Sequence, residues 1–344
     1  MAGGAASQEK ERQLMSLGFG AVTRPTWIAL EYLRWLGLES CEPPIPLDEV
    51  LDDLEKRGID VIFYHLSEVP EEDRLSAGVD EYLVRTGDEV ILGINRDRPV
   101  TRQRFSIFHG IGHELMVWHH EANYLTIGCV MHPFTTRPYE LEAHQFAAVM
   151  NMPPRNFKED MGSLPLGLSS IVELADRYTA SVESAGIRYA GLSDRPCCIA
   201  ILNTALLAHA TNDPIEFLGV PMQVDEPIQQ PEQTTDKCLR VRYSVRSSTF
   251  PYAVRPGVRI IQGENPLVWA SRFNAEAAGQ ISGLALGINS QARFNVEARP
   301  LNPVYNPGEV IAFVYPVTSK PFSVVSFPLR TEGTLSTQAI GGLQ

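Results

Sequence analysis

Two histidines four residues apart, His109 and His113, constrain the fold of this chain more than any other feature of its sequence. They lie in residues 101–118, where apolar side chains recur about every 3.6 residues and predict a helix. Positions i and i+4 of a helix face the same way, so two imidazoles at this spacing can share one Zn²⁺. The pair by itself is a weak signal, because solvated or core histidines also occur at this spacing. The flanking sequence decides between the two interpretations.

A second predicted helix, residues 139–150, completes a pattern that a known family shares. The first segment reads Arg102-Gln-Arg-Phe-Ser-Ile-Phe-His109-Gly110-Ile-Gly-His113, and the second reads Tyr139-Glu140-Leu-Glu142-Ala-His144-Gln-Phe-Ala-Ala-Val-Met-Asn-Met-Pro153. Together they resemble the ImmA/IrrE family of zinc peptidases, whose helices read R-Q-R-F-[ST]-x-x-H-E-x-G-H and E-x-x-A-N-x-F-A-A-x-x-x-M-P. The positions that agree are Arg102 to Phe105, His109, Gly112, His113, Glu140, Ala143, Phe146, Ala147, Met152 and Pro153.

The resemblance implies a set of metal ligands. His109 and His113 would bind zinc, and Glu140 would be the third ligand, supplied from the second helix. Glu142 competes for that role, but at i+2 it points to the opposite side of the helix from Glu140. Two histidines and one carboxylate suit Zn²⁺, although Mn²⁺ or Fe²⁺ would fit similar ligands.

One departure from the family pattern concerns catalysis. The family has a glutamate directly after the first histidine, which acts as general base, and this chain has Gly110 there. Glycine accepts no proton, and it costs a helix roughly 1 kcal/mol relative to alanine. Glu114 lies about 100° round the helix from His113 and is not expected to substitute. Since loss of a general base costs ~10²–10⁴ in rate, we expect impaired proteolysis and can name no catalytic residue.

A second departure is His144, where the family usually has asparagine. His144 shares a helix face with Glu140, so it could reach the metal as a fourth ligand and close the site. Alternatively it takes the place of the asparagine as a hydrogen-bonding group beside the ligands. The other histidines that follow the first helix, His119, His120 and His132, are expected to be solvated or loop residues.

The order of the predicted elements indicates an α+β chain of several domains. In the N-terminal half we expect helices at 27–38 and 47–54, a strand at 59–64, a hairpin at 82–94 turning on Gly87-Asp88, and the two helices described above. Three short helices are expected next, at 156–161, 168–178 and 181–191. The remainder is expected to hold strands at 199–202, 238–245, 258–262, 293–297 and 310–316, an exposed loop at 224–236 and a helix at 266–278.

The resemblance covers residues 25 to about 325 and supplies the names of the domains. It implies a zincin-like peptidase domain (25–154), a helix-turn-helix-like linker domain (155–194) and a GAF-like α+β sensor domain (195–330), with a disordered leader (1–24) before them and a tail (331–344) after them. The linker and the sensor domain are similar to those of IrrE-type proteins, the stress-response branch of the family. The likeness of the sensor domain rests on general pattern and the order of elements rather than on a sharp motif.

Composition and charge restrict the setting and the partners. The net charge is −12, which argues against a general affinity for nucleic acid or anionic membranes. No apolar run approaches the ~18 residues of a membrane span, and residues 1–24 lack the apolar stretch of a secretory signal. The five cysteines are an odd number without framework spacing. A reduced cytoplasmic setting follows.

Local charge bears on the two C-terminal domains. Residues 154–194 hold four basic and six acidic side chains, whereas a DNA-reading module normally presents a basic face, so direct DNA binding is not favoured. Arg240, Arg242 and Arg246 are spaced by even numbers and would share one face of a strand. They would either line an anion pocket or form a solvated strand face.

Three functions fit these observations. The first is a zinc-binding stress-response regulator that engages a helix-turn-helix repressor (XRE-type, DdrO-like) of DNA-damage-response genes, with catalysis impaired at Gly110. The second is an active, divergent zinc endopeptidase that cleaves this repressor. The third is a DNA-binding regulator acting through residues 155–192. The glycine favours the first function over the second, and the local charge weakens the third.

Overall fold

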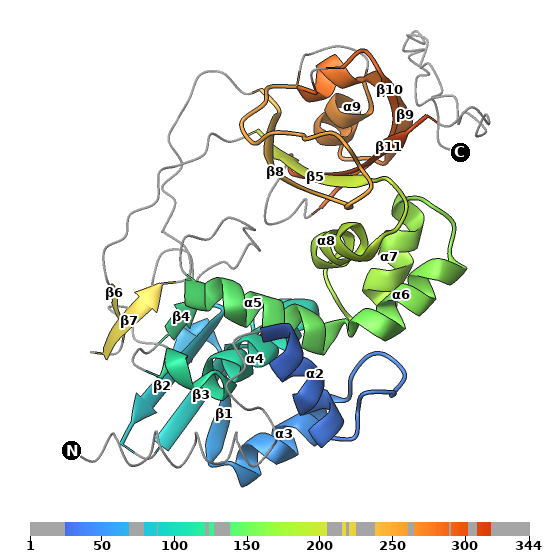
Figure 1. The fold of residues 1–344 in the computed structure, drawn as a ribbon. Coiled ribbons are helices and arrows are strands. Elements are labelled where there is room, and N and C mark those ends of the chain that lie inside the picture. Colours follow the sequence, from blue (N-terminus) through green and yellow to red (C-terminus); the bar gives the residue numbers. More distant parts are fainter. Residues whose placement is uncertain are drawn as a thin grey trace, which may run out of the picture.

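The computed structural model describes residues 25–68, 79–87, 89–120, 124–126, 138–204, 215–217, 220–224, 238–260, 265–288, 290–301 and 308–317. The expected leader, the expected tail and nearly all of the loop at 224–236 lie outside the described residues. Figure 1 shows an N-terminal part and a C-terminal sheet at opposite ends, with three helices beside and between them. The expected α+β class is confirmed.

The N-terminal part is built on a six-stranded mixed sheet. Its strands are β1 (Ile59–Tyr64), β2 (Glu81–Thr86), β3 (Glu89–Asn95), β4 (Tyr124–Thr126), β6 (Ile215–Phe217) and β7 (Val220–Val224), in the spatial order β1-β3-β2-β4-β7-β6. β1 runs parallel to β3, and β2 and β3 form the expected antiparallel hairpin. The hairpin turns at Gly87, whose φ of 62° is a conformation that glycine adopts without strain. The β6–β7 hairpin comes from much later in the chain and pairs with β4.

Four helices pack with this sheet around one apolar core. They are α2 (Pro25–Trp35), α3 (Leu47–Lys56), α4 (Val100–Leu115) and α5 (Pro138–Asn151). α5 lies directly against α4, because Gly112 leaves room for Phe146: a Cβ added at residue 112 would lie 3.1 Å from the Phe146 Cδ1 atom. The glycine therefore lets the second helix come close to the histidine-bearing face of the first.

The three helices α6 (Pro154–Ser163), α7 (Leu168–Arg177) and α8 (Val182–Leu192) cover one face of the C-terminal sheet. This antiparallel sheet has the order β8 (Arg240–Arg246), β5 (Cys198–Asn203), β11 (Val310–Pro316), β10 (Arg293–Pro300), β9 (Ala277–Ser282). Side chains of β5 alternate between its faces: Ile199 and Ile201 join the core with α6–α8, whereas Cys198, Ala200 and Leu202 join the core on the side of α9 (Pro266–Phe273). Figure 1 shows α8 and α9 on opposite sides of this sheet.

Hydrogen bonds fix the three helices to both neighbours. The Arg188 Nη2 atom in α8 donates to the carbonyl oxygen of Met152, 2.7 Å away, at the end of the N-terminal part. The Glu297 Oε2 atom in β10 accepts from the backbone N–H of Leu168, 2.7 Å away, at the start of α7. The helices therefore connect the C-terminal sheet to the N-terminal part through bonds to backbone groups.

Three element predictions are wrong in their extent. The helix expected at 101–118 ends at Leu115, because Met116 leaves helical geometry at φ −88°, ψ 89°, and a 3₁₀ turn, η3 (Val117–His119), follows. The helix expected at 266–278 ends at Phe273, because Asn274 adopts the left-handed conformation, and β9 follows where the helix was expected to continue. Within the described residues of the strand expected at 258–262, only Arg259 forms a bridge, to Arg240.

The three arginines of β8 make contacts within the C-terminal domain. Arg242 is buried, and its Nη1 atom lies 3.3 Å from Glu309 Oε1. Arg240 and Arg246 donate to backbone carbonyl oxygens of neighbouring loops. These bonds favour neither the anion pocket nor the fully solvated face that the sequence left open. As for the membrane, the helices that the structure describes are all too short or too polar to cross one.

Candidate metal centre

Three of the predicted residues meet in the core between α4 and α5. His109, His113 and Glu140 each offer one ligand atom, and these atoms all lie within 4.8 Å of one another. The Glu140 Oε2 atom is 3.4 Å from His109 Nε2 and 3.3 Å from His113 Nε2. All three side chains are buried. The structure thus brings together the set that the family resemblance implied, with both Nε2 atoms directed to the same carboxylate.

A carboxylate that the sequence analysis missed fixes the orientation of His109. Glu81, the first residue of β2, contacts the Nδ1 atom of His109 through Oε1. An ionised carboxylate only accepts hydrogen bonds, so Nδ1 carries the hydrogen and Nε2 faces Glu140. Within the described residues, His109 Nε2 makes no hydrogen bond. This is the arrangement of a metal-ligating histidine, whose other nitrogen typically donates to a carboxylate or carbonyl.

The electrostatics of this site favour a cation. Burial alone would lower the pKa of His109, but the neighbouring carboxylates of Glu81 and Glu140 outweigh burial and raise the pKa well above its usual value. Two carboxylates around one imidazole therefore hold either a proton on His109 or a positive ion among the three residues. The donor set fits Zn²⁺, because buried histidine and carboxylate ligands are those of zinc sites with an open fourth position.

His113 is held by a second histidine. Its Nδ1 atom lies 2.9 Å from Nδ1 of His119, and His119 Nε2 lies 2.8 Å from Glu142 Oε2. The prediction that His119 is a solvated or loop residue is wrong: its side chain is fully buried. Burial is the main cause that lowers the pKa of His119, to about 4, which favours the neutral ring. His120 is half-buried and bonds the Glu114 carbonyl oxygen, and His132 lies outside the described residues.

The 3₁₀ turn explains why His119 reaches His113. In a continuous helix the two residues, six positions apart, would lie about 240° round the axis from each other. Because α4 stops at Leu115, the turn Val117–His119 folds back and places the two rings 5.0 Å apart between centroids. The break in the helix therefore creates the contact.

His144 lies beside the three-residue group. Its ring centroid is 4.7 Å from that of His109 and 5.8 Å from that of Phe105. It does not belong to the metal-binding group found among the described residues. Its role, supporting residue or fourth ligand, stays a prediction.

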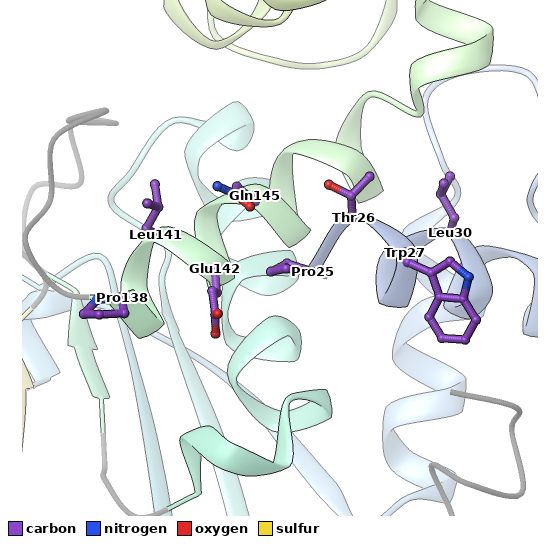
Figure 2. Close-up of a pocket in the computed structure, with 8 residues that line it drawn as sticks. All are labelled: Pro25, Thr26, Trp27, Leu30, Pro138, Leu141, Glu142 and Gln145. Carbon is purple, nitrogen blue, oxygen red and sulfur yellow. The ribbon is translucent and has the colours of Figure 1, made fainter. Parts of the chain in front are cut away.

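Two hollows lie on the outer side of α5. A groove of about 700 Å³ runs between α2 and α5, and Figure 2 shows Leu141 and Gln145 on one side of α5 with Glu142 directed to the other. A second cavity of about 440 Å³ lies between α5, α8 and β8, and His144 lines it. Glu142 lines the first hollow and His144 lines the second.

Gly110, the position of the missing general base, packs against Leu92 of β3. A Cβ added at residue 110 would lie 2.3 Å from Leu92 Cδ1, 2.9 Å from Cδ2 and 3.2 Å from Cγ. Leu92 is 1% exposed and belongs to the N-terminal core. The room that a side chain at 110 would need is therefore filled by leucine.

Glu114 does not take over the place of the base. Its Oε2 atom accepts from Arg85 Nε, 3.0 Å away on β2, and Arg85 Nη2 also donates to the carbonyl oxygen of His113. Glu114 is thus held by Arg85 of β2. The sequence-based expectation that it cannot substitute agrees with this position.

The sequence contains little that would identify Glu81, His119 or Leu92 as parts of this site. Glu81 shares a strand face with Leu83, so an acidic residue occupies a core-facing register position. A buried charge at such a position needs a partner, which could have suggested a histidine. The contacts of His119 and Leu92 depend on the helix break and on tertiary packing, and no local pattern predicts them.

The part of the chain that contains this centre matches a known family. Residues 54–189 match the peptidase family model described as the IrrE N-terminal-like domain. The solved structure of a Mycobacterium tuberculosis transcriptional regulator is similar at 10% identity and a TM-score of 0.47, over 90% of this chain and 93% of that one. No curated protein matches the sequence.

The fold and site define a metallopeptidase-like domain with a histidine–histidine–glutamate centre. Residues 54–189 are of the ImmA/IrrE type, and over these residues the resemblance carried by the two helices is confirmed.

We expect the purified chain to hold about one zinc ion, as for a single site with two histidines and one carboxylate. Elemental analysis of the native chain beside a His109→Ala/His113→Ala variant measures this. The double variant should lose the metal while keeping its circular dichroism spectrum. Equal zinc in both proteins would place the metal elsewhere, and a metal-free native chain would mean that this centre survives only as a scaffold.

The packing of Gly110 on Leu92 predicts that the effect of Gly110→Ala on stability changes sign when Leu92 is replaced by alanine. Gly110→Ala gains roughly 1 kcal/mol of helix propensity but overpacks the core by ~1–3 kcal/mol, so it should destabilise the native chain. In a Leu92→Ala background the clashing atoms are gone, and the same change should stabilise. Denaturant titrations of the four proteins measure both effects.

Gly162 in α6 is the matched control, because a Cβ there would meet no atom within 4 Å. Gly162→Ala should have the same effect in both backgrounds. If Gly110→Ala were equally stabilising with and without Leu92, the packing described here would be wrong.

Proposed function

We propose that this chain is a zinc-binding stress-response regulator that engages a helix-turn-helix repressor of the XRE type (DdrO-like), with its peptidase activity impaired. The IrrE N-terminal-like domain supports the regulator class, and the site residues supply the chemistry. The substrate class of such a centre is protein, through a peptide segment of the repressor.

His109, His113 and Glu140 would hold the metal, with Glu81 fixing the first of them. A bound Zn²⁺ supplies Lewis acidity toward a carbonyl oxygen or a water molecule. Mn²⁺ or Fe²⁺ would suit similar ligands, and the donor set alone does not choose among them. His144 is proposed as a supporting residue whose ring packs on His109.

Impaired catalysis rests on Gly110, which has no carboxyl group, and the Leu92 side chain lies where a Cβ at residue 110 would be. A missing base could be supplied by a neighbouring acid if space were open beside the metal group. Here the space is apolar and filled, and Glu114 is bonded to Arg85. Glu81 and Glu140 already contact the imidazoles. The described acids around the centre therefore have structural partners, which favours binding over cleavage.

The alternative of direct DNA binding through residues 155–192 gains no support from the helices. Their cations are engaged by acids or by backbone: Lys158 pairs with Asp194, Arg155 with Glu159 and Arg177 with Asp160. Arg188 donates to Met152. A surface that attracts phosphates would present such charges to solvent without partners.

The remaining domains extend the proposal. The helices α6–α8 would be the helix-turn-helix-like linker (155–194), and the sheet with α9 would be the GAF-like sensor (195–330), which signals to the peptidase domain (25–154). The Glu297–Leu168 and Arg188–Met152 bonds provide a physical connection for such a signal. The four cysteines among the described residues form no disulfide, which supports a reduced cytoplasmic setting.

A cleavage assay tests the proposal. The zinc-loaded chain is incubated with purified XRE-type repressors encoded in the same genome, and products are followed by mass spectrometry. We expect the native chain to bind a repressor without cutting it. Gly110→Glu alone should remain inactive, because Leu92 obstructs the new side chain. Leu92→Ala/Gly110→Glu should gain cleavage, by ~10²-fold or more over the native chain.

Adding His109→Ala to the double variant should abolish the gained activity. Cleavage by the unmodified chain that His109→Ala removes would contradict impaired catalysis and establish the active peptidase instead. A chain that neither binds nor cuts any of the repressors would contradict the proposed partner.

A further inference from the structure

The metal-facing histidines differ in what holds them. Glu81 lies beside the Nδ1 atom of His109, whereas a second imidazole lies beside the Nδ1 atom of His113. That place is taken by His119, 2.9 Å away, and Glu142 Oε2 lies 2.8 Å behind it. Trp118 also donates from Nε1 to Glu142 Oε2, at 2.7 Å. The carboxylate on this side thus acts through an intervening ring.

The direction of these hydrogen bonds follows from the acceptor at their end. An ionised Glu142 only accepts, so His119 Nε2 carries the hydrogen that points to it. A neutral imidazole has one N–H, which leaves the Nδ1 atom of His119 as an acceptor. His113 must then donate from Nδ1, and its Nε2 lone pair faces Glu140. With the opposite assignment, Nε2 of His113 would point a hydrogen into the metal centre.

We propose that His119, backed by Glu142, is a positioning residue that sets the tautomer and orientation of His113 for metal binding. This inference rests on the proposed metal site and goes beyond its ligands. We call the chain of contacts from Glu142 through His119 to His113 the relay. The η3 turn fixes the His119 backbone, and Trp118 and His119 both contact the same Glu142 oxygen. The Tyr139 ring also packs on the His119 ring, with 4.6 Å between centroids.

Glu142 is the outer end of the relay. It lines the groove between α2 and α5, and its side chain is 28% exposed, whereas His113 and His119 are buried. The family resemblance made Glu142 only a competitor of Glu140 for the metal. The structure gives it a different place, one imidazole removed from the ligand set.

Zinc affinity measured by competition with a chromogenic chelator tests the proposal. His119→Ala should weaken zinc binding by about 10–100-fold, as is typical when a partner of a ligating histidine is lost. His119→Phe keeps a ring but has no acceptor, and should weaken binding equally. His119→Asn places an oxygen near the position of Nδ1 and should recover part of the loss. His120→Ala is the matched control and should bind as the native chain does.

A second measurement reads the tautomer without any metal. Nitrogen-15 spectra of histidine-labelled, metal-free protein should show His113 protonated at Nδ1 in the native chain and in His119→Asn. In His119→Phe this signature should be lost or mixed. The spectra separate positioning from a general loss of folding, since Nδ1 protonation of His109 should be unchanged in every variant.

The outcomes distinguish this inference from the proposed function. If the native chain binds zinc and both His119→Ala and His119→Phe bind it equally well, the relay has no positioning role, and the metal site stands. If His119→Asn were as weak as His119→Ala, packing rather than the hydrogen bond would explain the effect. If the native chain binds no zinc, the proposed metal site itself fails.

Discussion

The close packing of α5 on α4 is the constraint on which the site depends. Glu140 lies beside His109 and His113, and Gly112 supports this approach because it leaves room for Phe146 against the helix. Because these three polar side chains are buried in an apolar core, they must contact one another or bind an ion. The contacts of Glu81 and His119 follow from the same need, because they give partners to the buried Nδ1 atoms of His109 and His113.

The second glycine of α4 has a comparable role on another side of the helix. Gly110 admits Leu92 from β3 as Gly112 admits Phe146 from α5. Two glycines in one helix weaken it by roughly 1 kcal/mol each relative to alanine, and close interlocking with neighbours offsets that cost. The position that serves chemistry in the family pattern thus serves packing in this chain. Gly110 has no carboxyl group, and the Leu92 side chain lies in the space beside it.

The sequence predicted this centre better than it predicted the fold around it. His109, His113 and Glu140 come from local helical spacing and a specific pair of motifs, and the structure brings them together. β9 was mistaken for the end of a helix, because one left-handed residue, Asn274, ends α9 where apolar periodicity continues. His119 was misplaced because α4 ends before Met116 and a 3₁₀ turn follows. Local sequence patterns predict which face of a helix or strand a side chain occupies, whereas helix breaks and long-range packing determine which side chains come into contact.

A crystal structure of the zinc-loaded chain, with anomalous data at the zinc absorption edge, would show where the metal binds and which side chains surround it. We predict one anomalous peak, bound by His109 Nε2, His113 Nε2 and Glu140, with Leu92 against Gly110 and no carboxylate beside the remaining coordination position. A peak elsewhere would contradict the assigned ligands. A glutamate or aspartate side chain placed next to the open position would supply the missing base and contradict the impaired-peptidase account.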